Sequence, residues 1–316
     1  MVKIIAGLMG SSVSSGSTAM TGAEQLRPFL SAIKKHDVLE LDTARVYNGG
    51  KSEENIGNIA EARQDFTIAT KAPGFSPGSL AYQKVIDNCN ASLKALKQDK
   101  IDLYYFHGPD RTTPLDESCR AIHELHQEGK IAKFGVSNFS ADEVEDIHRI
   151  CSTNGWLTPS VYQGMYNPLT RTGERTLFPI LRKLSMAFYA FSPLAGGFFS
   201  KSAEQLRTPA QDGRMVQMEH FANMYVNNIS LEMHDRLTQV CTAEGLTVKE
   251  ATLRWLLQHS TLESEDGVVL GGSSTQQMEE NLMACGGGPL SDSVITCFED
   301  MWTRWQEAGK AMPAWV

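Results

Sequence analysis

The sequence lacks both a run rich in lysine and arginine and a long apolar stretch. Its 29 basic and 37 acidic side chains give a formal net charge of −8, which argues against nucleic acid or an anionic membrane as the main partner. No apolar run approaches the ~18 residues of a membrane span, and the apolar part of the N-terminus is too short for a signal peptide. We therefore expect a cytoplasmic protein whose partner is a small molecule.

The sequence has few features of a metal or disulfide protein. Its six cysteines form no C-x-x-C pair and have no histidine at ligand spacing, so reduced structural thiols are expected. His123 and His126 lie three residues apart in "HELHQE", but this is not the H-E-x-x-H pattern that binds zinc. We interpret these two histidines as part of a solvated helix face and predict no metal site.

The common phosphate-binding motifs are also missing. The letters "GKS" at 50–52 resemble the end of a nucleotide-triphosphate loop, but Arg45 stands where that loop needs its first glycine. No G-x-G-x-x-G follows a predicted strand, so the βαβ dinucleotide fingerprint is not present either. Instead, the pattern predicts a helix with Ser52 as its N-cap and Glu53 and Glu54 in its first turn.

Eight short runs rich in Val, Ile, Tyr and Phe alternate with longer helical patterns, as in a parallel sheet with crossover helices. Asp42, Lys71 and His107 end three successive runs at separations of 29 and 36 residues, near the ~31 expected for one βα unit of a ~250-residue barrel. The predicted fold is an α/β (β/α)8 TIM barrel that forms a single domain over 1–316. The runs are "KIIAGL", "VLELD", "FTIAT", "IDLYYFH", "AKFGVS", "SVYQGMY", "MAFYAFS" and "GVVLGG".

One region departs from this alternation. A polar loop within 195–226 is far longer than a usual connection, and we expect it to cover the barrel mouth together with the C-terminal helix and tail. Helices are predicted over 24–36, 52–62, 79–97, 115–129, 140–154, 174–184, 229–244, 248–260, 275–284 and 291–308.

Ionisable residues stand at the ends of the predicted strands, where the active site of such a barrel lies. Asp42, Lys71 and His107 end three neighbouring strands, and Tyr47 follows the first of them. A buried lysine needs a partner, and Asp42 is the natural one. The alternative is an ion-pair network that only closes the end of the barrel.

These four residues suit the reduction of a carbonyl group. A cation about 4 Å from a tyrosine lowers the pKa of its hydroxyl, so Tyr47 beside Lys71 becomes a usable proton donor. A neutral His107 could hydrogen-bond the carbonyl oxygen that receives this proton. Because no side chain supplies a hydride, a nicotinamide cofactor must bind nearby.

Several motifs resemble those of the aldo-keto reductases, NAD(P)H-dependent barrel enzymes, over essentially the whole chain. They are "LDTARVY" through "ENIG" at 41–57, "TK" at 70–71, "DLYYFH" at 102–107, "GKIAKFGVSNF" at 129–139, "FSPLAGG" at 191–197 and "GGSSTQQMEEN" at 271–281. "HGPDRTTPLDE" and "YNPLTR" are similar to the aflatoxin-aldehyde-reductase branch. The resemblance implies that Tyr47 is the general acid, that Lys71 and Asp42 tune its pKa, and that His107 orients the carbonyl. It also suggests a homodimer.

The resemblance further implies where the cofactor binds. The nicotinamide carboxamide is assigned to Ser137, Asn138 and Gln163, and the ring face to Phe191, at a position where tyrosine is common. Without the family context, Phe191 could be ordinary strand packing, and Ser137 with Asn138 a turn with a helix cap. The other assigned residues are Ser192, Leu194, Gly196, Gly271, Ser273, Ser274, Gln277, Glu280 and Asn281, which include the capped start of helix 275–284, an anion site.

NADPH is expected rather than NADH, although the segment 271–281 has no lysine or arginine for a 2′-phosphate. Lys201 or Arg214 in the long loop could supply that charge. Three segments should decide the substrate: the loop at 10–22, the long loop and the tail. In the long loop, Phe221, Met224 and Tyr225 are either core residues or part of a pocket wall. The tail has Trp315 and no arginine after Arg304, whereas the similar branch tends to end in an arginine that meets a carboxylate. We therefore expect an apolar or aromatic carbonyl, such as a secondary metabolite.

Two other functions stay open at this point. A cofactor-binding regulatory subunit on the same fold would not need an acid, so the set of Asp42, Tyr47, Lys71 and His107 counts against it. A Schiff-base lyase with Lys71 as nucleophile is the third hypothesis, and borohydride trapping with substrate would separate it, since only a Schiff base leaves a covalent adduct.

Overall fold

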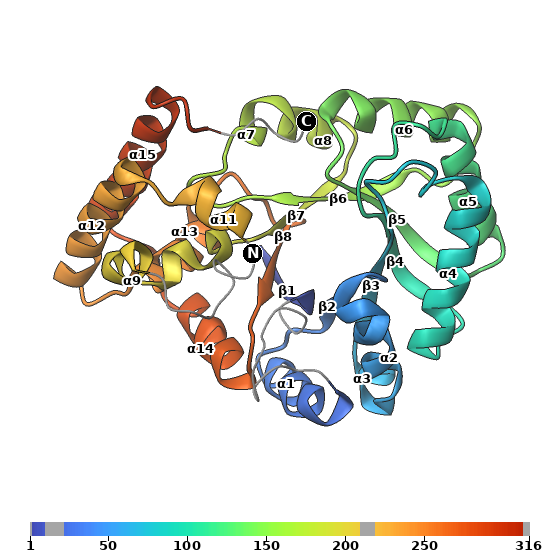
Figure 1. The fold of residues 1–316 in the computed structure, drawn as a ribbon, viewed down its shortest axis with the longest axis horizontal. Coiled ribbons are helices and arrows are strands. Elements are labelled where there is room, and N and C mark those ends of the chain that lie inside the picture. The colour runs from blue at the N-terminus through green and yellow to red at the C-terminus, as the bar shows by residue number, and fades with distance from the viewer. Residues whose placement is uncertain (1, 10–21, 209–218, 312–316) are drawn as a thin grey trace.

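The computed structural model describes residues 2–9, 22–208 and 219–311, and within them eight parallel strands close into a barrel surrounded by helices (Figure 1). All eight predicted strands are confirmed, so the (β/α)8 barrel is the fold. The strands are β1 (Lys3–Gly7), β2 (Glu40–Asp42), β3 (Thr67–Ala72), β4 (Ile101–Phe106), β5 (Ile131–Ser137), β6 (Pro159–Met165), β7 (Ala187–Phe191) and β8 (Gly267–Gly271).

Alternation along the strands builds two separate cores. Leu103 and Tyr105 of β4 point into the barrel, where a small cluster fills the interior. Tyr104 and Phe106 of the same strand belong to the much larger core between the strands and the helices. Because both faces of each strand are buried, the strands read as nearly continuous apolar runs, which is why they could be found in the sequence.

The helices around the barrel present one apolar face to it, as their sequence periodicity predicts. Those that match single predicted helices are α1 (Ala23–Lys35), α4 (Tyr82–Leu96), α5 (Leu115–Gln127), α6 (Ala141–Thr153), α12 (Asn228–Ala243), α13 (Val248–Gln258), α14 (Thr275–Cys285) and α15 (Asp292–Glu307). None of the helices in the described ranges is long and apolar enough to cross a membrane.

Two predicted helices are each divided into two. The stretch 52–62 forms α2 (Lys51–Gly57) and α3 (Ala60–Asp65), because the buried Ile59 takes an extended backbone between them. The stretch 174–184 forms α7 (Gly173–Thr176) and α8 (Phe178–Lys183). Here the reason is Pro179, which has no N–H to donate to the preceding helical turn.

The prediction that Ser52 caps α2 is wrong. Three residues with positive φ, Asn48 (52°), Gly49 (60°) and Gly50 (88°), turn the chain so that the helix begins at Lys51 with Gly50 before it. Ser52 is buried inside the first turn, and its hydroxyl lies 2.8 Å from that of Thr43. Glu53 and Glu54 do stand in the first turn, as predicted.

The region predicted as one long loop contains helical segments. After β7 come η3 (Ala195–Ser200), α9 (Ala203–Arg207) and α11 (Glu219–Tyr225), and the chain then enters α12. Tyr225 is core rather than pocket wall, since only 1% of it is exposed and its hydroxyl bonds Asn167 and Thr170. Four sequence predictions lie outside the described residues or side chains: the loop at 10–21, Arg214, Phe221 and the tail with Trp315.

The C-terminal helix α15 lies beside α12 in the outer layer (left in Figure 1). It also reaches the segment after β6, where Arg171 bonds Glu299 of α15. The single domain over 1–316 stays a prediction.

Candidate active site

The four predicted catalytic residues meet at the C-terminal ends of neighbouring strands. Asp42 is the last residue of β2, Lys71 is the next-to-last residue of β3, and His107 directly follows β4. Tyr47 begins η2 (Tyr47–Gly50), the turn that follows β2. The parallel register of β2, β3 and β4 brings these ends to one edge of the barrel.

Lys71 and Asp42 form a buried ion pair, as predicted. Lys71 has no exposed surface and Asp42 is 3% exposed, and the Nζ and Oδ1 atoms are 2.5 Å apart. Lys71 also donates to the Thr43 carbonyl at 2.7 Å, and Asp42 accepts from the Gln163 amide at 2.7 Å. Burial lowers the pKa of Lys71, while the carboxylates of Asp42 and Glu53 oppose that shift. The pair is thus well satisfied, which a buried charge requires.

The ring of Tyr47 lies between the cation and the histidine. Lys71 Nζ is 5.2 Å from the centroid of the Tyr47 ring, and the rings of Tyr47 and His107 meet edge to face with centroids 5.6 Å apart. The structure therefore brings together all four residues that the sequence predicted.

His107 is held in its neutral form. Burial and the positive charge of Lys71 lower the pKa of the imidazole to about 3. Its backbone carbonyl accepts a hydrogen bond from Asn138 at 2.9 Å, which links β4 to the end of β5. A neutral imidazole keeps one ring N–H, so it can donate to an oxygen without carrying charge.

A second ion pair, Arg45–Glu53, lies next to these four residues, and the sequence analysis did not assign it a role. Glu53 of α2 is fully buried, bonds the Arg45 guanidinium and accepts from the Thr70 hydroxyl at 2.7 Å. The signal available in the sequence was its spacing, because Glu53 shares the buried face of α2 with Ile56 and Gly57. We call Asp42, Lys71, Arg45 and Glu53 the mouth cluster.

Apolar side chains stand at the same mouth, and they too escaped the sequence analysis. Phe75 is 60% exposed, has a φ of 67°, and its ring meets the His107 ring edge to face at 5.9 Å. A positive φ is unusual for a bulky residue and costs backbone energy. Val46, next to Tyr47, is exposed as well.

The residues predicted to hold the nicotinamide lie at the ends of β5, β6 and β7. Ser137 and Gln163 are buried, and Asn138 takes a positive φ of 65° that turns its side chain toward His107 and Ser137. The amide oxygen of Asn138 is buried and has no hydrogen-bond partner within the described part of the chain. The Gln163 amide N–H donates to Asp42, so Gln163 also helps to hold the Lys71–Asp42 ion pair. Phe191 is the partly buried last residue of β7.

The segment after β7 bends sharply. Ser192 and Gly196 both have positive φ, at 54° and 65°, and the Ser192 carbonyl accepts from Ala195 N–H at 3.0 Å and Asn167 Nδ2 at 3.2 Å. Leu194 precedes η3, and Lys201 follows it. The segment is thus a hydrogen-bonded turn that leads from β7 into η3, where Gly196 and Gly197 take positive φ.

The segment after β8 starts helix α14 with the predicted cap. Ser274 accepts from Gln277 N–H, and Gln277 in turn accepts from both the backbone and the hydroxyl of Ser273. Asn281 donates to the Gly271 carbonyl at 3.1 Å, while its own amide oxygen is buried with no hydrogen-bond partner in residues 2–9, 22–208 and 219–311.

The segment 271–281, where the resemblance places the adenosine end of the cofactor and which we call the adenosine-end segment, has a basic neighbour from another helix. Lys249 of α13 lies 3.4 Å from the carboxylate of Glu280. Lys249 is distant from 271–281 in the sequence, so the absence of lysine and arginine from that segment gave no indication of it.

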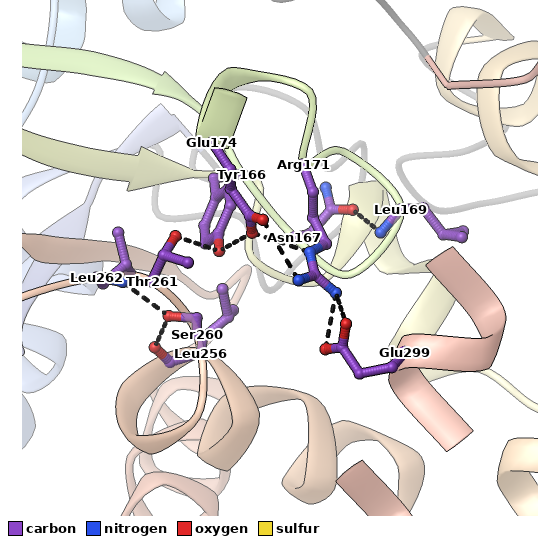
Figure 2. Close-up of polar contacts among 10 residues, drawn as sticks. All are labelled: Tyr166, Asn167, Leu169, Arg171, Glu174, Leu256, Ser260, Thr261, Leu262 and Glu299. Atoms are coloured by element: carbon purple, nitrogen blue, oxygen red, sulfur yellow. Dashed lines mark hydrogen bonds and ion pairs between the residues drawn. The ribbon is translucent and has the colours of Figure 1, made fainter. Parts of the chain in front are cut away.

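A different charged cluster lies at the side of the barrel (Figure 2). Arg171, after β6, is 8% exposed and bonds both oxygens of Glu299 at 2.9 and 3.0 Å and Glu174 at 2.9 Å. Tyr166 donates to the same Glu174 oxygen at 2.7 Å. We call Arg171, Glu174 and Glu299 the rim cluster. Its arginine is the last residue of the "YNPLTR" segment, which the sequence analysis noted without assigning it a structure.

Comparison with known proteins gives consistent matches along the chain. The Aldo/keto reductase family model matches residues 3–303. The chain is 38% identical over 304 residues to human "Aldo-keto reductase family 7 member A3", covering 90% of this chain and 89% of that protein. It is 37% identical over 302 residues to human "Aflatoxin B1 aldehyde reductase member 4", covering 90% and 89%. It is 36% identical over 295 residues to "Oxidoreductase sirO" of Leptosphaeria maculans, covering 91% and 88%.

Proposed function

The chain belongs to the aldo/keto reductase family, and on that premise we propose that it reduces an aldehyde or ketone to an alcohol with NADPH and with Tyr47 as proton donor. The family and its oxidoreductase relatives support carbonyl reduction by a nicotinamide cofactor. The observation that carries the finer proposal is the meeting of Tyr47, Lys71, Asp42 and a neutral His107 at one barrel mouth.

Each of the four residues has a role that follows from its position. Lys71 places a cation beside the Tyr47 ring, which favours the phenolate and makes the hydroxyl a stronger acid. Asp42 holds Lys71 in place and compensates its burial. His107 donates a neutral hydrogen bond to the carbonyl oxygen, which polarises the carbonyl and orients it toward Tyr47. When bound, the reduced nicotinamide supplies the hydride.

The residues around the mouth fit this cofactor. The buried amide oxygens of Asn138 and Asn281 have no partner among the residues that the structure describes, and amide and amino groups of a dinucleotide would satisfy them. The capped N-terminus of α14 and the turn at Ser192 and Gly196 offer backbone N–H groups to phosphate. Lys249 stands near the adenosine-end segment through Glu280, which supports NADPH over NADH.

The mouth favours an apolar or aromatic substrate. Phe75 and Val46 expose their side chains beside His107 and Tyr47, and the sequence has no arginine after Arg304 to meet a substrate carboxylate. An aromatic carbonyl could stack against Phe75 while its oxygen meets Tyr47 and His107. The homodimer and the cytoplasmic location stay predictions.

The proposal is tested by cofactor titration followed by turnover. Quenching of protein fluorescence by NADPH and by NADH gives both affinities, and oxidation of NADPH is then followed with a panel of aromatic aldehydes and diketones. We expect tighter binding of NADPH, and a turnover that falls roughly 10²- to 10⁴-fold in Tyr47→Phe with unchanged cofactor affinity. Binding without turnover would favour a regulatory subunit, and a protein that binds neither cofactor would sink the proposal.

A further inference from the structure

We propose that Arg45 and Glu53 form a positioning pair, which holds the turn bearing Tyr47 and sets the charge that its hydroxyl experiences. The inference rests on the proposed function, because it assigns the pair a role toward the acid of that reaction. Neither residue was among the predicted site residues, and neither needs to touch a substrate or cofactor to act.

The contacts of Arg45 show how the turn is held. Its Nη1 bonds Glu53 of α2 and also donates to the Gly50 carbonyl at 3.2 Å. Arg45 N–H points to the Lys71 carbonyl at 3.4 Å. The side chain thus spans the turn from 47 to 50 and adds to the bonds that the Lys51 N–H makes to the Asn48 and Tyr47 carbonyls.

The contacts of Glu53 show why the pair is more than a surface clamp. One carboxylate oxygen bonds Arg45 and the other accepts from Thr70, the residue before Lys71. The carboxylate has no exposed surface and lies close enough to Lys71 to oppose the lowering of its pKa. A buried anion so near Lys71 contributes to the electrostatic potential at Tyr47, as Lys71 itself does.

Each ionisable group of this network has a defined charge. Lys71 on β3 and Arg45 in the loop are positive, Asp42 on β2 and Glu53 on α2 are negative, and His107 after β4 is neutral. Removal of the Glu53 charge leaves the cations in excess, which favours the phenolate of Tyr47. The pKa of Tyr47 should then fall, and as a scale, one charge acting over roughly 10 Å at an effective dielectric of 20 shifts a pKa by about one unit.

The experiment measures the ionisation of Tyr47 without any turnover. Each variant is titrated by its ultraviolet phenolate absorbance and compared with the same variant carrying Tyr47→Phe, so that the difference belongs to Tyr47 alone. Glu53→Gln should lower the midpoint by about one pH unit. Glu61→Gln on the neighbouring helix α3, an exposed acid paired with Arg27, is the matched control and should leave the midpoint unchanged.

A second variant tests the positional part of the pair. Arg45→Lys keeps the charge but loses the fork that bonds both Glu53 and Gly50. We expect its Tyr47 midpoint to match the wild type, its turnover to fall about tenfold, and its cofactor affinity to stay unchanged. This variant also carries the test if Glu53→Gln does not fold.

The outcomes separate this inference from the proposed function. An unmoved Tyr47 midpoint in folded Glu53→Gln, or full turnover in Arg45→Lys, would overturn the positioning pair. A wild-type protein that reduces no carbonyl would overturn the proposed function, yet the Tyr47 titration would still decide whether the pair sets the field.

Discussion

The mouth cluster and the rim cluster use the same chemical groups in opposite ways. Both hold arginine or lysine against carboxylates near the end of a barrel strand, through short hydrogen bonds. At the mouth, Lys71 and Glu53 are completely buried and a tyrosine and a histidine lie against the charges. At the rim, Glu299 is 48% exposed and the arginine packs over Trp255 and Trp302.

The difference shows that a charge network by itself does not identify an active site. Breaking either network should destabilise the protein, because each leaves a carboxylate unpaired. At the mouth, Tyr47 and the neutral His107 are groups that can donate a proton or a hydrogen bond to a substrate, whereas the Tyr166 hydroxyl at the rim is buried and bonded to Glu174. The rim cluster joins the loop after β6 to helix α15, so its role is to fasten the C-terminal helix (Figure 2).

The largest expected effect is on turnover, in Lys71→Met. Without the cation the Tyr47 hydroxyl is a weaker acid, so kcat should fall roughly 10²- to 10⁴-fold. Asp42 also loses its partner inside the barrel, which should lower stability by about 3–5 kcal/mol. Turnover is measured per folded molecule, with thermal unfolding measured in parallel. A wild-type kcat in this variant would contradict a catalytic role for the mouth cluster and leave it, like the rim cluster, with a role in stability alone.

The rim cluster should respond in stability alone. Arg171→Met leaves Glu174 partly buried and unpaired and removes the cation from the two tryptophans, so we expect a loss of about 3 kcal/mol in the free energy of unfolding. This is the low end for a buried pair, because Glu299 can reach water. Turnover per folded molecule should stay within about threefold of wild type.

The exposed pair Arg236–Asp300, which joins α12 to α15 at 2.9 Å, provides the control for Arg171→Met. Arg236→Gln should cost under about 1 kcal/mol, since solvent screens both charges. Denaturant unfolding measures both variants. Equal effects of the two substitutions would contradict a fastening role for the rim cluster.

A smaller effect is the pH dependence that His107 imparts to stability. Its pKa is about 3 in the folded protein and 6.5 when exposed, so below pH 6.5 the unfolded chain binds a proton that the folded chain does not. Stability from this group is therefore complete above 6.5 and declines as the pH falls toward 3, by at most about 1.4 kcal/mol per pH unit.

The check is unfolding free energy from about pH 7 to 5 in wild type and His107→Gln. The variant should have the flatter profile. Parallel profiles would mean that His107 is not held neutral at the mouth.

The sequence was sufficient for the barrel and the four central residues because their signals are local. Strands buried on both faces are continuous apolar runs, and Asp42, Lys71 and His107 stand at their ends. The errors have local causes as well. Positive φ at Gly50 moved the start of α2 away from Ser52, and Pro179 divided a predicted helix.

The supporting residues could not be predicted because their partners are distant or depend on how elements pack. Glu53 meets Thr70 across 17 residues, and Arg171 meets Glu299 across 128. Lys249 reaches Glu280 from a different helix, which no inspection of 271–281 could detect. Phe75 combines an unusual positive φ with an exposed ring beside His107, and neither feature has a signal in the sequence.

In the proposed reaction, hydride passes from a nicotinamide to a carbonyl carbon while Tyr47 supplies the proton. NADPH labelled with deuterium at the reactive C4 position is incubated with the aromatic aldehydes and diketones of the panel, and the products are analysed by mass spectrometry and NMR. We expect one deuterium on the alcohol carbon, in a single stereochemical configuration, and a strongly reduced rate of alcohol formation in Tyr47→Phe. Alcohol that forms without the label, or at an equal rate in Tyr47→Phe, would contradict it.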